Sequence, residues 1–370
     1  MVVVGGGPAG AAAAIALAQA GVSAVVLEAA SETWAKVGES LPPSANPALD
    51  RLGLTDVVSR CGLPSYGNRS VWGSVEPVDT DFVFGTAGSG WRVDRALFEA
   101  EAALVAIAAG ADWRYGARVV GCVRGELGGW KLQVADGAGA RSLHADVVVD
   151  GSGRAARVAR LMGARRVRYD RLVGAVAYGP VRSGVDVSDL DSTTLVEAVP
   201  QGWWYSMFLP GQQLVVGFMT DADLLDERGA RTSLGLGQLL EAAPQTAARV
   251  SSAGGFVGWP EPHIRPAHTS RLTEVTGPDW LAVGDAAITY DPLTSYGITA
   301  ALGHGIYAAA AVVEHLAGRP DALPGHTRLI DGAFARYLGL LHDRYAVEQR
   351  WPDAPFWQRR HCPQRLESQA

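Results

Sequence analysis

The sequence has few cysteines, few lysines and no excess of positive charge. Cys61, Cys122 and Cys362 are widely spaced in the 370 residues and form no Cys-x-x-Cys or Cys/His ligand pattern, so neither a disulfide framework nor a metal site is predicted. The only lysines are Lys36 and Lys131, and the formal net charge is −6. Nucleic-acid binding requires concentrated positive charge, so we expect no nucleic-acid partner.

The apolar start of the chain does not indicate a membrane span. The apolar segment Gly10–Ala20 is shorter than the roughly 20 residues that span a bilayer, and the apolar start continues into a glycine turn instead of a signal-peptide cleavage site. We therefore expect a cytoplasmic protein with no membrane partner. The chain is 48% hydrophobic and 19% charged, as in globular proteins, and is long enough for two interleaved lobes.

The first thirty residues carry the order of elements found in dinucleotide-binding units. Val2–Val4 is a continuous apolar run, as expected of a buried parallel strand. Residues 5–10, Gly-Gly-Gly-Pro-Ala-Gly, fit G-x-G-x-x-G, and an alanine-rich helix and a second strand, Ser23–Leu27, follow. A glycine motif alone is weak, but strand, loop, helix, strand and acidic residue together are specific. This segment does not distinguish NAD from FAD.

Each part of this loop has a physical role. Gly5 makes the tight turn, Gly7 lets a pyrophosphate approach the backbone, and Gly10 allows helix and strand to pack closely. The helix N-terminus directs its positive dipole end at the pyrophosphate. Glu28 lies 18 residues beyond Gly10, where a carboxylate can accept hydrogen bonds from ribose hydroxyls. The predicted cofactor-binding residues of this segment are Gly5, Gly7, Pro8, Ala9, Gly10 and Glu28.

Three later segments point to FAD. The strand Ala145–Val149 runs into Asp-Gly-Ser-Gly-Arg at 150–154, Leu281–Ala287 is a buried strand ending in Gly-Asp-Ala-Ala, and Asp291–Ile298 contains a proline and opens the apolar helix Thr299–Leu316. Together with the N-terminal glycines, these motifs resemble those of the FAD-dependent aromatic hydroxylases and flavin-dependent halogenases. The resemblance spans almost the whole chain.

The resemblance implies how the flavin is held. The aspartate of the Gly-Asp pair, Asp285, binds the ribityl chain, and the helix after Pro292 directs its N-terminus at the pyrimidine edge, where reduced flavin carries negative charge. Taken alone, Asp285 could equally be a helix N-cap. Arg95 is expected to reach the FAD pyrophosphate, the alternative being an exposed helical arginine. The further cofactor-binding residues implied are Lys36, Glu39, Ser40, Arg95, Gly284, Asp285, Pro292, Ser295, Gly297 and Ile298.

Other segments narrow the resemblance to one branch. The segment Val37–Pro43 contains Gly-Glu-Ser-Leu-Pro-Pro, and it looks like a branch that contains halogenases and the flavoprotein monooxygenases that mature tryptophan-derived quinone cofactors. Glu197–Trp204, Met219–Asp221 and the tail Tyr345–Arg360 also look like the maturation enzymes.

The expected fold is α/β, with an FAD-binding Rossmann-like domain of the aromatic hydroxylase type in residues 1–160 and 272–330. Residues 161–271 contain short β-rich runs separated by turns and are predicted to form an inserted antiparallel substrate-binding sheet. Trp203, Trp204 and Tyr205 are predicted pocket residues, although alternation allows only one of the tryptophans to face the pocket. Residues 331–370 form a helical tail, which either packs an aromatic stripe on the protein or contacts a large substrate or partner.

The resemblance implies oxygen chemistry through a flavin C4a-hydroperoxide. Halogenases also require a lysine after the Gly-Glu element, and this chain has none between Lys36 and Lys131. Their W-x-W-x-I-P element is replaced by adjacent tryptophans at 203–204. We therefore predict hydroxylation of an aromatic group, in a peptide or protein tryptophan or tyrosine or in a natural-product precursor. The alternatives are a flavin-dependent halogenase and a non-catalytic flavin-bearing maturation or binding partner.

Two carboxylates are candidates for proton handling. Glu197 is expected beside the pocket tryptophans, where an apolar setting makes a carboxylate a usable base; the alternative is a carboxylate satisfied by backbone or arginine. Glu39 lies near the flavin by family analogy, where its role could be purely positional. Electrons are expected from NAD(P)H directly or through a separate flavin reductase, since no second nucleotide fingerprint is present.

Overall fold

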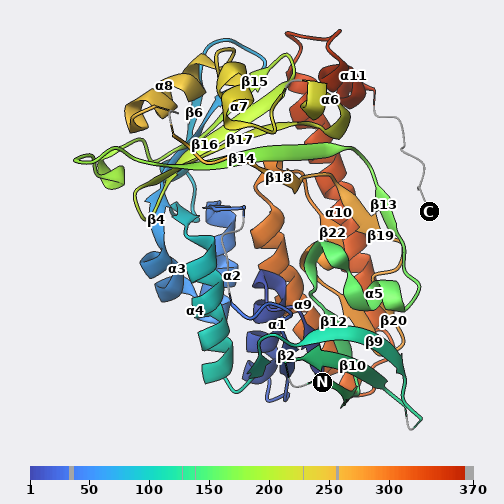
Figure 1. Ribbon diagram of the computed structural model, residues 1–370. Helices are drawn as coiled ribbons and strands as arrows, with labels where there is room; N and C mark the ends of the chain where they lie inside the picture. Colours follow the sequence, from blue (N-terminus) through green and yellow to red (C-terminus); the bar gives the residue numbers. More distant parts are fainter. Residues whose placement is uncertain (33–36, 127, 138, 228, 256–257, 363–370) are drawn as a thin grey trace.

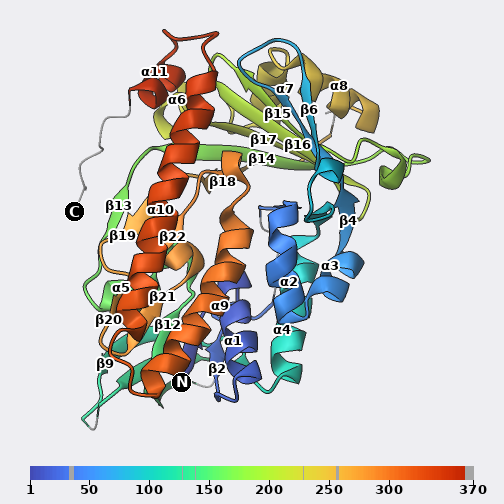
Figure 2. The ribbon, with the colours of Figure 1, turned by 180° about the vertical axis from the view of Figure 1, so that it is seen from behind.

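The computed structural model describes residues 1–370 except 33–36, 127, 138, 228, 256–257 and 363–370. A lower lobe is built on a parallel sheet, and an upper lobe is built on a large, mostly antiparallel sheet (Figure 1). Long helices connect the lobes on the far side, where α10 extends from the lower lobe up to α11 (Figure 2). This arrangement confirms the predicted fold class.

The lower lobe contains a six-stranded sheet in the order β20-β21-β12-β1-β2-β8. Its strands are β20 (Thr276–Gly277), β21 (Trp280–Ala282), β12 (Val148–Asp150), β1 (Val2–Val4), β2 (Val25–Leu27) and β8 (Asp112–Arg114). All neighbours are parallel except β20 and β21. The chain leaves β1 for β2 on one side, and β12 lies on the other, so a crevice opens at the carboxyl end of β1.

Helices pack closely on this sheet. The alanine-rich α1 (Pro8–Gln19) lies against α4 (Arg95–Ala108) and α9 (Gly297–Leu316). A Cβ atom at Gly305 of α9 would lie 2.5 Å from the carbonyl oxygen of Ala9, so glycine is required for this approach. Helix α9 is long and apolar enough to cross a membrane, but it packs against α1 and α10 (Ala322–Val347), as a core helix does.

Smaller elements complete the lower lobe. One three-stranded sheet contains β9 (Arg118–Arg124), β10 (Trp130–Asp136) and β11 (Gly139–Ala145); a second contains β13 (Arg166–Arg168), β19 (Ser270–Leu272) and β22 (Ile288–Thr289); a third contains β3 (Ser40–Leu41), β4 (Gly62–Ser65) and β7 (Gly90–Val93). The short helices are α2 (Asn46–Leu52), α3 (Thr55–Cys61) and α5 (Arg157–Leu161).

The upper lobe is a seven-stranded sheet in the order β18-β14-β17-β16-β15-β5-β6. The strands are β18 (His263–Pro266), β14 (Leu172–Pro180), β17 (Gln213–Asp221), β16 (Gly202–Leu209), β15 (Thr194–Val199), β5 (Gly67–Val71) and β6 (Val78–Asp81). Helices α6 (Ala222–Glu227), α7 (Ser233–Leu240) and α8 (Pro244–Ala253) follow β17. Apolar side chains of α7 and α8 share a buried cluster with one face of the sheet, and the other face is turned to the lower lobe.

Two strands of this sheet come from outside the predicted substrate segment. β5 pairs with β15 in parallel and β6 with β5, although residues 67–81 were expected in the first FAD segment. The sequence did not indicate this because β6, Val-Asp-Thr-Asp, is exposed along its length and carries no apolar alternation. The sheet is therefore made by residues 161–271 together with this excursion.

The C-terminal tail packs on the protein. In α11 (Pro355–His361), Phe356 and Trp357 are fully buried, and the Trp357 indole N–H donates to the Val199 carbonyl at 2.9 Å. The Arg359 and Arg360 guanidiniums lie 2.8 and 2.9 Å from the Asp221 carboxylate. The tail was expected either to pack on the protein or to contact a large substrate or partner. These residues pack on the protein, because their rings are buried and their charges are paired within the same chain.

Candidate flavin and substrate site

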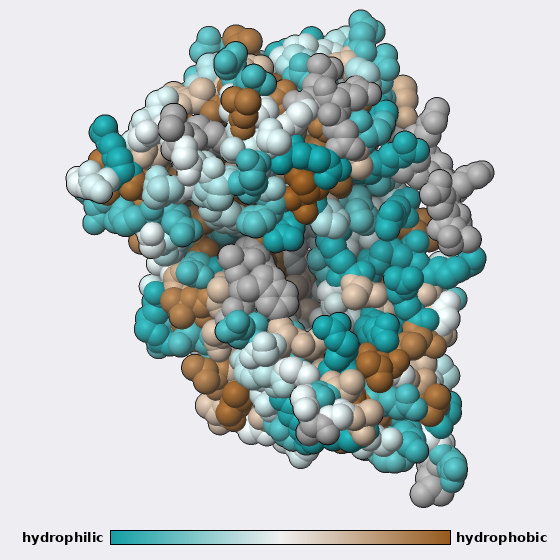
Figure 3. Space-filling model, in the orientation of Figure 1, coloured by the Kyte–Doolittle hydropathy of each residue, from teal (hydrophilic) through white to brown (hydrophobic). Residues whose placement is uncertain are grey.

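A pocket of about 940 Å³ lies between the carboxyl ends of β1 and β2, the start of α9 and one face of the large sheet. Its mouth corresponds to the hollow between the lobes in Figure 3. The volume is near the upper end of the roughly 300–1,000 Å³ range of ligand and cofactor pockets. Most of the residues predicted from the glycine loop and from the start of α9 line this single space.

The glycine loop has the geometry that its predicted roles require. Gly5 has a φ of +99°, and a Cβ atom there would lie 2.3 Å from the Gly151 carbonyl oxygen. A Cβ atom at Gly10 would lie 1.9 Å from the Gly5 carbonyl oxygen. A Cβ atom at Gly7 would meet nothing within 4 Å, because Gly7 faces the pocket. Gly10 therefore acts through packing, whereas Gly7 leaves space for a ligand.

Glu28 is held rigidly at the end of β2. Its Oε2 accepts the Gly6 N–H at 2.6 Å and its Oε1 accepts the Ala30 N–H at 2.8 Å. Each carboxylate oxygen can accept further hydrogen bonds, and Glu28 lines the pocket beside Pro8 and Ala9. The fixed carboxylate can therefore receive ligand hydroxyls.

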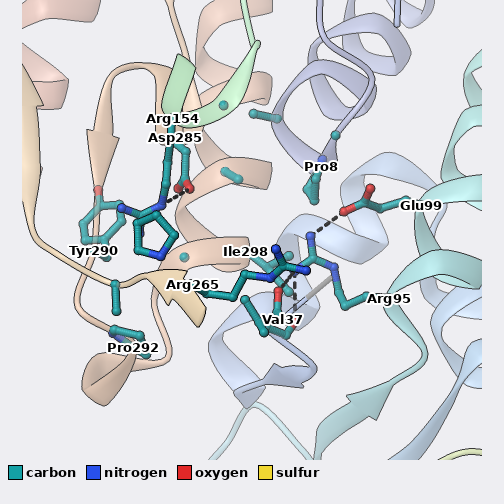
Figure 4. A pocket seen from close by; sticks show the side chains of 18 of the residues that line it. Pro8, Val37, Arg95, Glu99, Arg154, Arg265, Asp285, Tyr290, Pro292 and Ile298 are labelled. Atoms are coloured by element: carbon teal, nitrogen blue, oxygen red, sulfur yellow. Dashed lines mark hydrogen bonds and ion pairs between the residues drawn. The ribbon is translucent and has the colours of Figure 1, made fainter. Parts of the chain in front are cut away.

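The second group of predicted cofactor residues lies at the start of α9. Asp285, Pro292, Ser295, Gly297 and Ile298 all line the pocket. The Asp285 carboxylate lies 3.6 Å from Nε of Arg154 (Figure 4). Gly284 does not line the pocket; its φ is +54°, and a Cβ atom there would lie 2.7 Å from that of Ala9. Gly284 thus supports the site through backbone packing and not by contact.

Arg95 points into the pocket from the first turn of α4 (Figure 4). Its side chain is 10% exposed, pairs with Glu99, and donates from Nη1 to the carbonyl oxygens of Val37 and Gly38 at 3.1 and 3.0 Å. Its Nε is buried with no hydrogen-bond partner among the described residues. The alternative of an exposed helical arginine is therefore wrong. Lys36 lies outside the described residues.

Glu39 and Ser40 also line the pocket. The Glu39 side chain is 3% exposed; one carboxylate oxygen accepts the Gly38 N–H at 2.8 Å and the other accepts the Tyr178 hydroxyl. Burial raises the pKa of Glu39, although these hydrogen bonds oppose the shift. Glu39 is thus a buried carboxyl group of the pocket that takes up a proton more readily than an exposed glutamate.

The large sheet presents an apolar wall to this space. Trp203, Tyr205 and Met207 alternate along β16 and line the pocket. Trp204 was also a predicted pocket residue, and this prediction is wrong. Its ring points to the opposite face of the sheet and packs against Phe218, with ring centroids 4.9 Å apart, because successive side chains of a strand face opposite ways.

The prediction that Glu197 acts as a base in the pocket is also wrong. Its neighbours on β15, Thr194 and Val196, line the pocket, so Glu197 faces away from it. The Glu197 carboxylate accepts the Thr246 N–H and hydroxyl, both at 2.7 Å, and the Gln245 N–H at 3.2 Å. It therefore satisfies the free N–H groups at the start of α8.

These features agree with comparisons to known proteins. The family model described as an FAD binding domain matches residues 1–323. The chain belongs to this FAD-binding family. It is 29% identical over 369 residues to the putative FAD-dependent oxidoreductase LodB of Marinomonas mediterranea, covering 98% of this chain and 96% of that protein. Flavin-dependent halogenases are also among its relatives.

Solved structures of two enzymes share the fold. The myxobacterial chondrochloren halogenase CndH superposes with a TM-score of 0.86 at 24% identity, covering 97% of this chain and 85% of that one. The peptidyl tryptophan dihydroxylase QhpG, described as essential for tryptophylquinone cofactor biogenesis, has a TM-score of 0.78 at 26% identity, covering 99% and 79%. The chain is thus an FAD-dependent oxidoreductase of the hydroxylase and halogenase superfamily.

The pocket residues fit FAD on their own chemistry. The open side of Gly7 at the N-terminus of α1 suits a pyrophosphate, and the Nε of Arg95, which has no partner in the described part of the chain, suits an anion. Glu28 can receive the adenosine ribose hydroxyls, and Asp285 those of the ribityl chain. Gly297 and Ile298, in the first turn of α9, line the pocket, and N–H groups at a helix N-terminus can stabilise negative charge on a flavin ring.

Sequence analysis missed several pocket residues: Thr194, Met207, Met219, Arg265, Tyr290 and Asp291. Asp291 lies directly before Pro292 in a segment that was interpreted only as a helix start. Its carboxyl was therefore not predicted as a pocket group. The others lie on strands or turns without a motif, and no signal in the sequence separates a pocket-facing methionine from a core one.

Replacing Glu197 with alanine tests its structural role. The N–H groups of Gln245 and Thr246 lose their acceptor, so the free energy of unfolding should fall by about 1–3 kcal/mol, as measured by denaturant titration. FAD content and turnover per folded molecule should be unchanged. Glu39→Gln, which alters the pocket carboxyl, is the matched comparison and should change turnover. Loss of turnover in a folded, flavin-loaded Glu197→Ala protein would show that Glu197 takes part in the reaction.

Proposed function

We propose that this protein is an FAD-dependent monooxygenase that hydroxylates an aromatic group. The observation that carries the proposal is the wall of Trp203, Tyr205 and Met207 together with the absence of lysine among the described pocket residues. Lys131 is exposed on β10, and lysine is the residue with which halogenases handle hypohalous acid. Because no lysine stands between Lys36 and Lys131 in the sequence, and none lines the described part of the pocket, direct oxygen transfer is favoured.

Bound, reduced FAD supplies the activation of dioxygen, and the chain supplies position, dryness and protons. Val176, Val196 and Met219 extend the apolar wall that would exclude water from an aromatic substrate. Glu39, whose pKa is raised by burial, can exchange a proton inside the pocket, and the Tyr178 hydroxyl holds its carboxyl in place.

The same wall and the names of the relatives support a proposal for the substrate class. QhpG is named a peptidyl tryptophan dihydroxylase, which supports an aromatic side chain of a peptide or protein, while a natural-product precursor fits the same pocket. CndH and other relatives are named halogenases, which makes halogenation the second candidate. NAD(P)H or a separate flavin reductase as electron source, and a cytoplasmic location, stay predictions.

Product mass distinguishes the candidates. Purified protein should be incubated with tryptophan- and tyrosine-containing peptides and free aromatic compounds, NADH, a flavin reductase and air, with and without chloride or bromide. We expect a substrate-dependent product heavier by one or two oxygen atoms, equally abundant without halide. A product that gains a halogen only when halide is present would identify a halogenase, and no product with any substrate would favour a non-catalytic flavin carrier. Protein stripped of flavin is the control.

A further inference from the structure

The carboxyl group of Asp291 also lies in the wall of the pocket. Asp291 precedes the short 3-10 turn Pro292–Thr294, lines the pocket and is 2% exposed. Its Oδ1 accepts the Leu293 N–H at 2.9 Å, and its Oδ2 accepts the Tyr345 hydroxyl at 2.8 Å. The group is therefore fixed in orientation, and each oxygen retains room for another hydrogen bond.

The hydrogen bond to Tyr345 continues to the substrate wall. The Trp203 indole N–H donates to the Tyr345 hydroxyl oxygen at 3.1 Å, and Tyr345 in turn donates to Asp291. The Tyr345 ring is 3% exposed and packs against Trp72 and Trp357, with centroids 5.8 and 6.1 Å away. Tyr345 of α10 therefore links the pocket residues Trp203 and Asp291 in one series of hydrogen bonds.

The groups around Asp291 keep its two charge states close in free energy. Burial and the nearby Asp170 carboxylate raise its pKa to about 7, opposed by the Leu293 N–H, the Arg360 guanidinium of α11 and the Tyr345 hydroxyl. The Tyr337 hydroxyl of α10 accepts the Asp291 backbone N–H at 2.7 Å. A group with this pKa can take up and release a proton near neutral pH.

We propose that Asp291 is the pocket residue that takes up the proton released by the aromatic substrate, and that Tyr345 and Trp203 position its carboxyl. The proposal rests on the proposed hydroxylation. When oxygen is added to an aromatic carbon, the hydrogen on that carbon leaves as a proton and its C–H electron pair returns to the ring. The Asp291 carboxylate accepts this proton and later loses it to solvent. Dioxygen is the oxidant, its second oxygen atom leaves as water, and NAD(P)H or reduced flavin provides two electrons.

Infrared titration tests the assignment without turnover. The carbonyl band of a protonated carboxyl should disappear with a midpoint near pH 7 in the flavin-loaded protein and be missing in Asp291→Asn. In Tyr345→Phe the midpoint should move to higher pH, because the carboxylate loses a hydrogen-bond donor. Glu197→Gln, which changes a buried carboxyl on the opposite face of the sheet, should leave this band in place.

Turnover provides the second readout. With a substrate identified by product mass, kcat should rise with pH through about 7 in the wild type, and Asp291→Asn should lose this rise and on the order of 100-fold in kcat, with KM little changed. Tyr345→Phe should shift the profile in the direction of its infrared midpoint. A band that titrates unchanged in Asp291→Asn, or an Asp291→Asn enzyme with the wild-type kcat and pH profile, would overturn the proposal. A normal titration with no hydroxylated product would instead refute the proposed reaction alone.

Discussion

Gly10→Val will leave the protein without bound FAD. The Cβ position of residue 10 lies 1.9 Å from the Gly5 carbonyl oxygen and 3.4 Å from Cγ1 of Val3, so two further methyl groups force the start of α1 away from the loop. The backbone N–H groups that cradle a pyrophosphate then lose their positions. We expect no flavin absorbance in the purified variant and no recovery on adding FAD.

Two further glycines provide matched controls. Gly303 lies inside α9, where an added Cβ would meet nothing within 4 Å, so Gly303→Ala should keep its FAD. Gly7→Ala adds a Cβ that points into the pocket and touches no protein atom within 4 Å; it should fold normally but bind FAD more weakly. A yellow, FAD-loaded Gly10→Val protein would contradict this account of the loop.

A chain that ends at Arg350 will be strongly destabilised. The truncation removes the fully buried Phe356 and Trp357 and leaves the buried Asp221 carboxylate without its two arginines. Loss of each aromatic side chain alone costs about 3–5 kcal/mol, against a total stability of roughly 5–15 kcal/mol for most proteins. We expect precipitation or a much lower Tm, with loss of flavin, as measured by soluble yield and thermal unfolding.

Single substitutions distinguish the loss of buried side-chain packing from a general effect of altering the C-terminal helices. Trp357→Ala should lower the free energy of unfolding by about 3–5 kcal/mol, whereas Leu340→Ala, at a position 51% exposed on α10, should change it by less than about 0.5 kcal/mol. A truncated protein that unfolds like the full chain but binds substrate more weakly would show that the tail contacts substrate after all.

The cofactor half of the site could be predicted because its roles depend on backbone geometry. Gly5 and Gly10 are required by close backbone approaches, and Gly7 is required because it leaves space for a ligand. These requirements fix the spacing of the glycines in the sequence, so the motif can be recognised there. Asp285 and Pro292 were predicted from the resemblance to FAD-dependent hydroxylases and halogenases, and both line the pocket. Gly284 was predicted with them, but it acts through its packing on Ala9.

The substrate half could not be predicted as well, because it depends on which face of a strand a residue occupies. Trp204 and Glu197 each follow a pocket-facing residue by one position and therefore lie on the opposite face of the sheet. The strands around them carry apolar residues on both faces. β16 is buried along its whole length, so alternation of polar and apolar residues gives no indication of the pocket side. Asp291 acquires its importance from Tyr345, which is 54 residues away, and no local pattern connects the two.

In the function proposed for this protein, FAD in this pocket transfers oxygen from dioxygen to an aromatic carbon. The most direct test is product mass after turnover under dioxygen of the heavy oxygen isotope, in ordinary water and without halide. We expect each added oxygen atom in the product to carry the heavy label. A product whose added oxygen comes from water, or one that forms only with halide and carries a halogen, would contradict it.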